Sequence, residues 1–263
     1  MIQIQAIPAF NDNYIWCLYD DTSKQAVVVD PGDAAPVQES LTALDLELVA
    51  ILITHHHPDH TGGLNTLLHE NKHGKPIPVY GPDSPKISQI NHKLSEPESF
   101  SILGLTFNVI DIPGHTLDHI AMYCADSDLG PLLFCGDTLF AGGCGRIFEG
   151  NPAMMLASLS KLAELPANTR VYCAHEYTLS NLSFALAVEP NNPDLQQRFK
   201  TANELRQQQQ ATIPSLLQTE LLTNPFLRCS EATVIKSAEH HSGKPCSTNT
   251  EVFATIRSWK DNF

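Results

Sequence analysis

Short apolar runs that end in polar residues or in turn sequences recur along the first two-thirds of the chain. Apolar runs of about four to eight residues, continuous or alternating with polar positions, are typical of β-strands. The pattern predicts strands over residues 1–6, 14–19, 25–30, 48–53, 77–80, 101–112, 120–124, 132–135 and 171–173. We expect the second and third of these to pair as a hairpin, and the continuous run 48–53 to be buried.

Apolar residues at helical spacing mark four further segments. They are residues 35–44, the segment after Asn151-Pro152, a segment that Asn192 caps with Pro193 in its first turn, and residues 250–259. The strand signals stop after His175. We therefore expect an α/β domain over residues 1–175 and a smaller all-helical domain over residues 176–263.

The run from Thr54 to Gly63 follows the predicted strand 48–53 directly and is rich in candidate metal ligands. In extended backbone, side chains i and i+2 point the same way, so His55 and His57 can converge on one ion while His56 faces elsewhere. Asp59 and His60 fall in the turn that enters the next helix. A solvated histidine-rich loop is the alternative, but such a loop has no reason to follow a buried strand or to alternate ligands with spacers.

Three other predicted strands also end in a candidate ligand. His115 follows Pro113-Gly114, Asp137 follows Gly136, and His175 follows the strand 171–173. Each signal alone is weak, but together with the run at residues 54–63 they predict a metal site at strand ends, where active sites of α/β folds are placed. Imidazole and carboxylate ligands without thiolate accept zinc, iron or manganese.

Net charge and cysteine content limit the possible functions. The formal charge is −13 at pH 7 with 12 histidines counted as neutral, which argues against a nucleic acid as the main partner. The seven cysteines are odd in number and scattered, as is typical of reduced thiols in a cytoplasmic protein. We see no signal peptide and no apolar stretch of membrane-spanning length, so we expect a cytoplasmic protein without a membrane partner.

The ligand pattern as a whole resembles that of the metallo-β-lactamase superfamily: His-x-His-x-Asp-His, then a His after Pro-Gly, an Asp after Gly, and a late His. The resemblance implies a four-layer αβ/βα sandwich, with two mixed sheets packed face to face and helices outside, followed by the helical domain. Within the superfamily the chain is most similar to the glyoxalase II family, the hydroxyacylglutathione hydrolases. The matching segments span the chain: residues 12–14, 136–140, 143–146, 175–178 and 257–263.

Seven candidate ligands exceed the usual three protein ligands of a catalytic zinc, so we expect two divalent ions, zinc first, with iron or manganese as alternatives. A carboxylate suits the bridging position because it has two oxygens that can bind different ions. The resemblance implies that one ion is held by His55, His57 and His115, the other by Asp59, His60 and His175, and that Asp137 bridges both.

The resemblance also implies the reaction. A hydroxide that bridges the ions attacks the thioester carbonyl of S-(2-hydroxyacyl)glutathione, so that S-lactoylglutathione gives lactate and glutathione in methylglyoxal degradation. Asp59 and Asp137 are then the catalytic residues, through the metals that they hold. Asp59 is not assigned as a general base, because a carboxylate bound to a metal ion is not available to accept a proton. A general acid is hardly needed either, because the leaving group is a thiolate.

Glutathione carries two carboxylates, which are best bound by cations and above all by arginine. The resemblance points to Arg146, Arg257 and Lys260, with Tyr177 as a hydrogen-bond donor. Ordinary surface charge is the alternative, but Arg257 and Lys260 lie three residues apart on one predicted helix face. Many relatives have Lys in place of Arg146 and Tyr in place of Phe148.

Other residues near the ligands are expected to be structural. His119 is a candidate partner of the ligands, with a satisfied structural histidine as the favoured interpretation. Asp30 either braces the metal-binding loop or simply ends a strand. Cys135 and Cys173 lie on apolar strands, where small buried side chains are expected.

Three other functions fit parts of the pattern. A mononuclear iron dioxygenase acting on glutathione persulfide shares the fold but needs only three ligands. A phosphodiesterase or RNA-processing nuclease calls for a basic surface, and a non-enzymatic metal-binding or redox-sensing module leaves the placement of Arg257 and Lys260 unexplained. We expect a monomer that acts on a small-molecule glutathione thioester.

Overall fold

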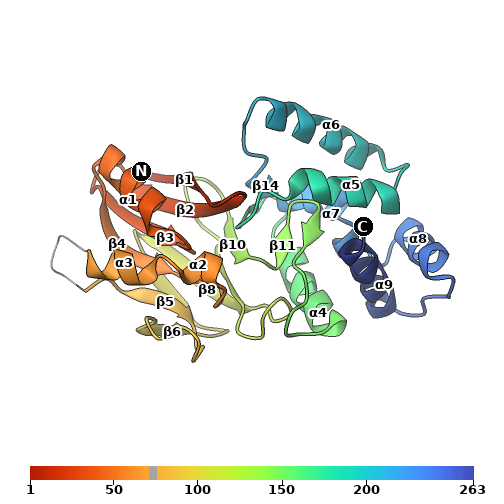
Figure 1. Cartoon of the computed structure of the whole chain (residues 1–263), viewed down its shortest axis with the longest axis horizontal. Coiled ribbons are helices and arrows are strands. Elements are labelled where there is room, and N and C mark those ends of the chain that lie inside the picture. Colours follow the sequence, from red (N-terminus) through yellow and green to blue (C-terminus); the bar gives the residue numbers. More distant parts are fainter. Residues whose placement is uncertain (71–75) are drawn as a thin grey trace. The chain divides into compact units, whose positions relative to one another are not determined.

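The computed structural model describes residues 1–70 and 76–263, and the chain divides into two compact units (Figure 1). The first unit comprises residues 1–111 and 118–136. The second comprises residues 112–117 and 137–263. The fold of each unit is described in turn.

The first unit begins with a six-stranded sheet whose strands lie in sequence order. The first three are joined by antiparallel pairing, and the last four, β3 to β6, pair in parallel. Parallel neighbours need a crossover connection, and helices supply it after β3 and β4. The strands are β1 (Ile2–Ala9), β2 (Asn13–Asp20), β3 (Gln25–Val29), β4 (Glu47–Leu52), β5 (Val79–Pro82) and β6 (His92–Leu94).

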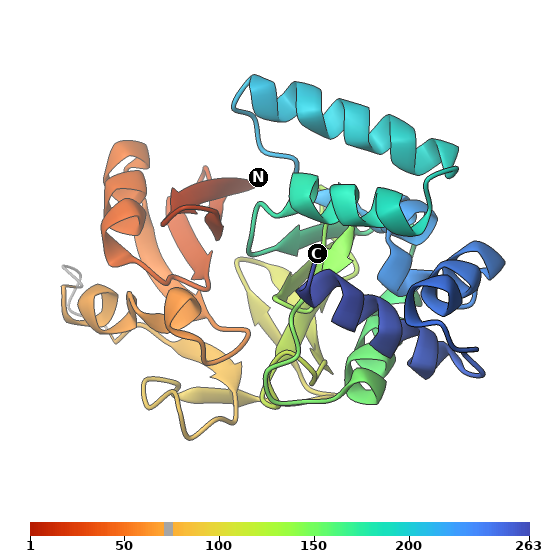
Figure 2. The same ribbon diagram turned by 45° about the vertical axis from the view of Figure 1, so that its right-hand side comes forward.

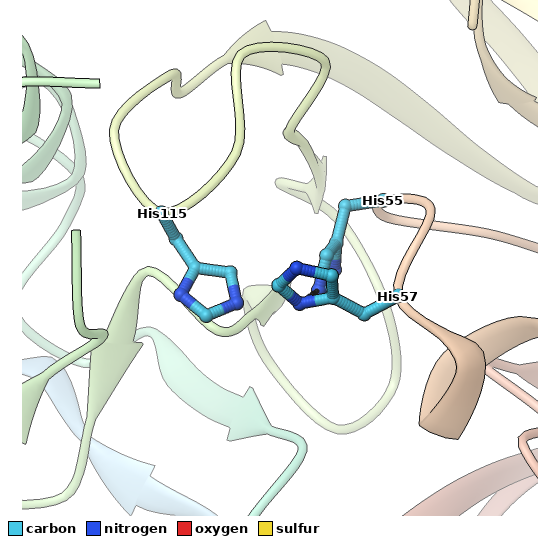
Figure 3. Close-up of side chains that lie close together, drawn as sticks. All are labelled: His55, His57 and His115. Atoms are coloured by element: carbon cyan, nitrogen blue, oxygen red, sulfur yellow. Dashed lines mark hydrogen bonds between the residues drawn. The ribbon is translucent and has the colours of Figure 1, made fainter. Parts of the chain in front are cut away.

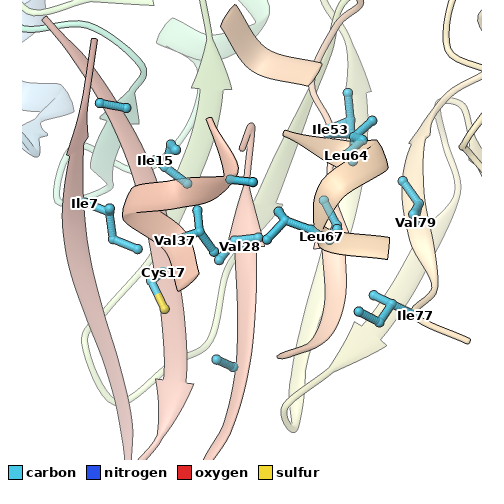
Figure 4. Close-up of a cluster of buried hydrophobic side chains, with 14 of the residues drawn as sticks. Ile7, Ile15, Cys17, Val28, Val37, Ile53, Leu64, Leu67, Ile77 and Val79 are labelled. Carbon is cyan, nitrogen blue, oxygen red and sulfur yellow. The ribbon is translucent and has the colours of Figure 1, made fainter. Parts of the chain in front are cut away.

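Helices α1 (Ala34–Leu44) and α3 (Leu64–His69) pack on one face of this sheet, with the short α2 (Pro58–Thr61) before α3 (Figure 4). Asp33 caps α1 by accepting a hydrogen bond from the backbone of Ala35, as N-cap carboxylates commonly do. The side chains between the helices and the sheet form one apolar core that includes Ile7, Ile15, Val28, Val37, Ile51, Ile53, Leu64 and Leu67.

A second sheet of the first unit contains β7 (Ser99–Ile102), β8 (Leu105–Asp111), β9 (Ile120–Cys124) and β10 (Leu132–Gly136), all antiparallel. Its side chains contact the first sheet. Tyr80 stacks on Phe100 with ring centroids 5.0 Å apart, and Leu94 packs with Val109 and Ile120. The two sheets of this unit therefore pack face to face, as the sequence predicts.

The prediction of a single strand over residues 101–112 is wrong. This segment belongs to a hairpin of β7 and β8, with the turn at Leu103 and Gly104. Both turn residues have positive φ, +51° and +76°, and glycine adopts such a conformation without steric cost. The apolar residues on either side continue the alternating pattern, so the run reads as one strand in the sequence.

The second unit has two short strand pairs and most of the helices. β11 (Leu139–Phe140) pairs with β12 (Gly143–Cys144), and β13 (Arg170–Cys173) pairs with β14 (Ser215–Leu216). In Figure 2, α5 and α6 lie side by side, as do α8 and α9. The helices are α4 (Pro152–Ala163), α5 (Thr178–Val188), α6 (Pro193–Gln207), α7 (Leu217–Thr223), α8 (Ala232–Ser242) and α9 (Asn249–Asp261), with a 3-10 turn at Pro225–Leu227.

Side-chain caps begin the helices where the sequence indicates. Asn151 and Asn192 each accept a hydrogen bond from the first turn of α4 and α6, with proline at the next position, a favoured combination. Thr248 and Glu251 form a capping box at α9, which satisfies two backbone groups at once. The predicted helices 35–44, after Asn151 and after Asn192 are confirmed, and so is the last helix.

Helix α5 and strand β14 have no counterpart in the sequence predictions. Leu182, Phe184, Ala185 and Val188 of α5 are all buried, and a helix that is apolar on most sides shows no amphipathic period. β14 has only two residues, so the region after His175 is helical apart from this short strand.

In the described part of the chain, no helix combines the length and hydropathy that a membrane crossing requires.

The seven cysteines all lie in the described part of the chain and form no disulfide there, and all except Cys246 are buried. Burial raises the pKa of the Cys17, Cys173 and Cys229 thiols to about 12, so these side chains hold almost no reactive thiolate at neutral pH.

We expect iodoacetamide to label Cys246 first in the native protein and all seven cysteines in denaturant. Peptide mass spectrometry measures this, and rapid native labelling of Cys173 would contradict the buried assignment.

Candidate metal centre

His55 and His57 follow β4 directly and bring two ring nitrogens together in the first unit. His55 Nε2 lies 3.1 Å from His57 Nδ1, and Figure 3 shows the two rings on the same side of this segment. Two nitrogen ligands of one tetrahedral zinc ion, each at about 2.0–2.1 Å, lie about 3.3 Å apart. The spacing of i and i+2 side chains therefore produces the pair that the sequence predicts.

A buried carboxylate orients His55 through an intervening threonine. Asp30 accepts hydrogen bonds from Thr54 N at 2.8 Å and from Thr54 Oγ1 at 2.7 Å. Since the Thr54 hydroxyl donates to Asp30, its oxygen can accept from His55 Nδ1, which lies 3.1 Å away. This arrangement places the proton of His55 on Nδ1 and leaves Nε2 available as a ligand.

The same carboxylate contacts a second candidate ligand. His60 is fully buried, and its Nδ1 lies 3.0 Å from Asp30 Oδ2. Its Nε2 lies 3.5 Å from Asp59 Oδ2. Asp30 has a φ of +54°, a conformation that costs a non-glycine residue on the order of 1–3 kcal/mol. Asp30 therefore braces the metal-binding loop, which was one of the two roles expected for it.

Asp59 is fixed from two sides. Asn13 Nδ2 donates to Asp59 Oδ2 at 3.0 Å. A β-carbon at Gly32 would lie 1.8 Å from the carbonyl oxygen of Asp59, so only glycine allows this approach. Asn13 is a partner that the sequence analysis did not identify, because a single Asn 46 residues away leaves no local signal.

The neighbouring histidines support the ligands. The Nδ1 of His56 donates to Asp118 at 2.9 Å. His119 is buried, donates from Nδ1 to the carbonyl of Ile120 and stacks on His55 with centroids 4.5 Å apart. The expected structural role of both residues agrees with these contacts.

The second unit carries its own cluster of candidate ligands. Asp137 Oδ2 lies 3.4 Å from His115 Nε2, and Asp137 Oδ1 lies 3.4 Å from His175 Nε2. His115 Nδ1 lies 2.7 Å from the carbonyl oxygen of Arg146. A carbonyl only accepts, so Nδ1 carries the proton and Nε2 remains available. His115 comes from the loop after β8 (Figure 3).

These two clusters have the composition of a divalent-metal site. The first contains His55, His57, Asp59 and His60, and the second contains His115, Asp137 and His175. All seven residues belong to groups of His and Asp side chains whose donor atoms could hold a metal ion. Both combine imidazole with carboxylate and include neither cysteine nor lysine. Such nitrogen and oxygen donors fit zinc, iron or manganese.

The residues expected to bind substrate lie on the second unit and differ in exposure. The Arg146 side chain is 58% exposed, and its Nε lies 3.3 Å from Asp261 Oδ1. Tyr177 is 37% exposed and stacks on His175 with centroids 4.6 Å apart. Lys260 Nζ donates to the carbonyl and hydroxyl oxygens of Ser180. Burial and the nearby Arg257 lower the pKa of Lys260.

Arg257 is buried, with only 7% of its surface exposed. Its Nη1 donates to the carbonyl of Cys144 at 2.9 Å, and its Nη2 donates to Asp261 Oδ1 at 3.1 Å. The guanidinium also lies 5.0 Å from the centre of the Phe226 ring. Its expected contact with a substrate carboxylate stays a prediction.

Comparison with known proteins identifies the family. Residues 13–175 match the model of the metallo-beta-lactamase superfamily, and residues 176–263 match that of the hydroxyacylglutathione hydrolase C-terminus. A hydroxyacylglutathione hydrolase of Pseudomonas paraeruginosa is 56% identical over 264 residues, covering 100% of both chains. The chain belongs to the hydroxyacylglutathione hydrolase family.

Solved structures of the same superfamily are more distant. The crystal structure of BLEG-1 B3 metallo-beta-lactamase has a TM-score of 0.61 and 25% identity, over 86% of this chain and 99% of that one. TTHA1623 in a di-iron-bound form has a TM-score of 0.51 and 27% identity, over 66% and 91%.

The expected fold class, a metallo-β-lactamase sandwich followed by a helical C-terminal region, is confirmed by these matches. Family membership also makes the chain an enzyme of the hydrolase class. The domain boundary at residue 175 stays a prediction.

The role of Asp30 leads to a testable expectation for this hydroxyacylglutathione hydrolase family member. Asp30→Asn keeps the shape of the side chain but removes the charge that holds Thr54 and faces His60. Loss of such a partner of metal ligands typically weakens metal binding about ten- to a hundred-fold. Competition for Zn²⁺ against a chromogenic chelator measures the change.

Asp33→Asn is the matched control, because Asp33 lies three residues away and only caps α1, a role that Asn fills equally well. If the two variants bind Zn²⁺ equally well, Asp30 does not brace the ligands.

Proposed function

We propose that this chain hydrolyses the thioester of S-(2-hydroxyacyl)glutathione, releasing glutathione and the hydroxy acid, as in the degradation of methylglyoxal. The observation that carries the proposal is the 56% identity, over the full length of both chains, to a hydroxyacylglutathione hydrolase. The buried imidazole and carboxylate clusters of both units are the groups that such a metallohydrolase needs.

Two divalent ions are proposed to be held by seven ligands. His55, His57 and His115 would hold one, Asp59, His60 and His175 the other, with Asp137 between them. The orientation of Asp137 supports the bridging role, because its two oxygens face different histidines, one from each proposed set. A structure with 27% identity to this chain is described as di-iron-bound. We expect zinc first, with iron or manganese as alternatives.

When bound, such an ion pair supplies a hydroxide nucleophile near neutral pH and charge stabilisation for a developing oxyanion. The residues of this chain orient the ligands: Asp30 and Thr54 orient His55, and the Arg146 carbonyl orients His115. Asn13 holds Asp59, and Asp59 as a ligand is not a general base. A thiolate leaving group needs no acid, which suits a site built from imidazoles and metal-binding carboxylates.

The glutathione part of the substrate is proposed to be bound by Arg146, Tyr177, Arg257 and Lys260. Its two carboxylates are best bound by cations, and in a chain with net charge −13 these must be gathered locally. Arg257 donates from Nη2 to Asp261, and its Nε has no hydrogen-bond partner among the described residues. A substrate carboxylate could therefore bind Nε or replace Asp261. We expect a monomeric protein with no nucleic-acid or membrane partner.

The decisive test is turnover of S-lactoylglutathione by the purified protein, followed as loss of thioester absorbance, beside a β-lactam and a phosphodiester. We expect hydrolysis of the thioester alone, about two metal ions per chain by elemental analysis, and loss of activity on chelation. Cleavage of the phosphodiester or β-lactam in place of the thioester would reject the proposal.

Asp137→Ala removes a proposed ligand of both ions. We therefore expect this variant to bind metal more weakly than His57→Ala, which removes a ligand of one ion, and to be nearly inactive. Elemental analysis after dialysis compares the two. Equal metal loss in both variants, or normal content in Asp137→Ala, would show that Asp137 is not a bridge.

Substrate recognition is tested with Arg146→Ala and Lys260→Ala. A hydrogen bond to a charged group contributes about 1.5–3 kcal/mol, but both side chains are partly exposed, so we expect a loss near the lower limit, roughly ten-fold in kcat/KM. Most of the loss should appear in KM, because the contact is made equally in the ground and transition states.

The control is a small thioester that lacks the glutathione carboxylates. Its hydrolysis should be nearly indifferent to both substitutions. Equal losses with the two substrates would mean that these residues support the fold or the metal ligands and do not recognise glutathione.

A further inference from the structure

Strands β11 and β12 form a hairpin over residues 139–144. Side chains of the C-terminal region hydrogen-bond to the backbone of this hairpin along its whole tip. Each residue from Phe140 to Cys144 has a backbone group that exchanges a hydrogen bond with such a side chain. The bonding residues are Asn181 on α5, Glu220 on α7, Asn224 after α7 and Arg257 on α9.

Asn224 bonds to both strands of the hairpin. Its Nδ2 donates to the carbonyls of Phe140 at 3.2 Å and Gly143 at 2.8 Å. Its Oδ1 accepts from the backbone N–H of Phe226, which fixes the orientation of the amide. The side chain is fully buried, where unsatisfied carbonyls are costly, so the hairpin is specified by this contact.

Glu220 holds the turn of the hairpin. It is fully buried, and its Oε2 accepts from the backbone N–H of Gly142 at 2.8 Å. Gly142 has a φ of +69°, which favours glycine. Arg198 pairs with the same carboxylate. Glu220 therefore ties the turn of the hairpin to Arg198 on α6.

The stem of the hairpin leads directly to two proposed metal ligands. Gly145 N donates to Thr138 O at 3.1 Å, and a β-carbon at Gly145 would lie 1.9 Å from the carbonyl oxygen of Asp137. The next carbonyl, that of Arg146, accepts from His115 Nδ1. Any shift of the hairpin therefore moves the backbone of Asp137 and the group that orients His115.

We propose that Glu220 and Asn224 are positioning residues for metal binding, which act on Asp137 and His115 through the β11–β12 hairpin. The helices after His175 then do more than carry substrate-binding cations. This inference rests on the proposed function for the identity of the metal ligands. Glu220 and Asn224 are not themselves among the proposed ligands.

Glu220→Ala tests the inference, with Glu189→Ala as the matched control. Glu189 is also a buried carboxylate of the C-terminal region paired with an arginine, Arg228. Glu189 also accepts a hydrogen bond from Thr233 Oγ1, and in the described part of the chain none of its hydrogen bonds reaches the hairpin. Both substitutions leave a partly buried arginine without its carboxylate partner, so their general cost to stability is comparable.

The measurements are Zn²⁺ affinity by chelator competition, the visible absorption spectrum of the Co²⁺-loaded protein, and urea unfolding. We expect Glu220→Ala to weaken Zn²⁺ binding about ten-fold or more relative to Glu189→Ala. Glu220→Ala should also change the Co²⁺ spectrum. Glu189→Ala should have the same Co²⁺ spectrum as the unaltered protein. Glu220→Gln keeps an oxygen that can accept from Gly142, so it should restore most of the affinity.

Equal Zn²⁺ affinities and Co²⁺ spectra in Glu220→Ala and Glu189→Ala would overturn the inference. If Glu220→Ala does not fold, Asn224→Ala replaces it, because it removes the bonds to Phe140 O and Gly143 O without leaving a buried charge. The same spectral change is then required. If the unaltered protein binds metal but does not cleave the thioester, the proposed function fails while the metal measurements still decide this inference.

Discussion

A histidine presents one chosen nitrogen to a metal only when its other nitrogen is protonated and held. Each unit of this chain meets that constraint with a hydrogen-bond acceptor. In the first unit the acceptor is the Thr54 hydroxyl, which in turn donates to Asp30. In the second unit it is the carbonyl of Arg146, which accepts from His115. The contacts among His55, Thr54 and Asp30 are buried, where hydrogen bonds are stronger than in water.

The parallel part of the first sheet explains why Asp30 can reach Thr54. Asp30 follows β3 and Thr54 follows β4, which are parallel neighbours, and the carboxyl ends of parallel strands meet at one edge of a sheet. The geometry requires Asp30 to adopt a positive φ and Gly32 to lie against the backbone of Asp59. Local strain near the ligands is thus balanced by buried hydrogen bonds to Thr54, as is common at functional sites.

The candidate ligands could be found in the sequence because they lie at the ends of apolar strands, where periodicity and residue type give the same answer. His55, His57 and Asp137 are examples. Their supporting residues were mostly not predictable. Asn13, Glu220 and Asn224 act through one or two hydrogen bonds to positions at least 46 residues away, and such contacts produce no period. The turn at Leu103 and Gly104 leaves only a weak signal, a change of phase in the alternating pattern between Ile102 and Leu105 with one glycine between them. Apolar residues continue on both sides, so the pattern predicts a single strand.

The C-terminal helix α9 links the proposed recognition of substrate to the proposed metal ligands. Arg257 bonds both Cys144 of the hairpin and Asp261, and Asp261 also lies 3.3 Å from the exposed Arg146. A substrate carboxylate that displaced Asp261 would therefore change the contacts of Arg146 and of Arg257 together. Because the carbonyl of Arg146 orients His115, and Arg257 holds the adjoining hairpin, binding at these cations would act on the same backbone that positions His115. Charge and geometry thus make α9 part of the framework of the proposed metal ligands as well as part of the proposed surface for glutathione.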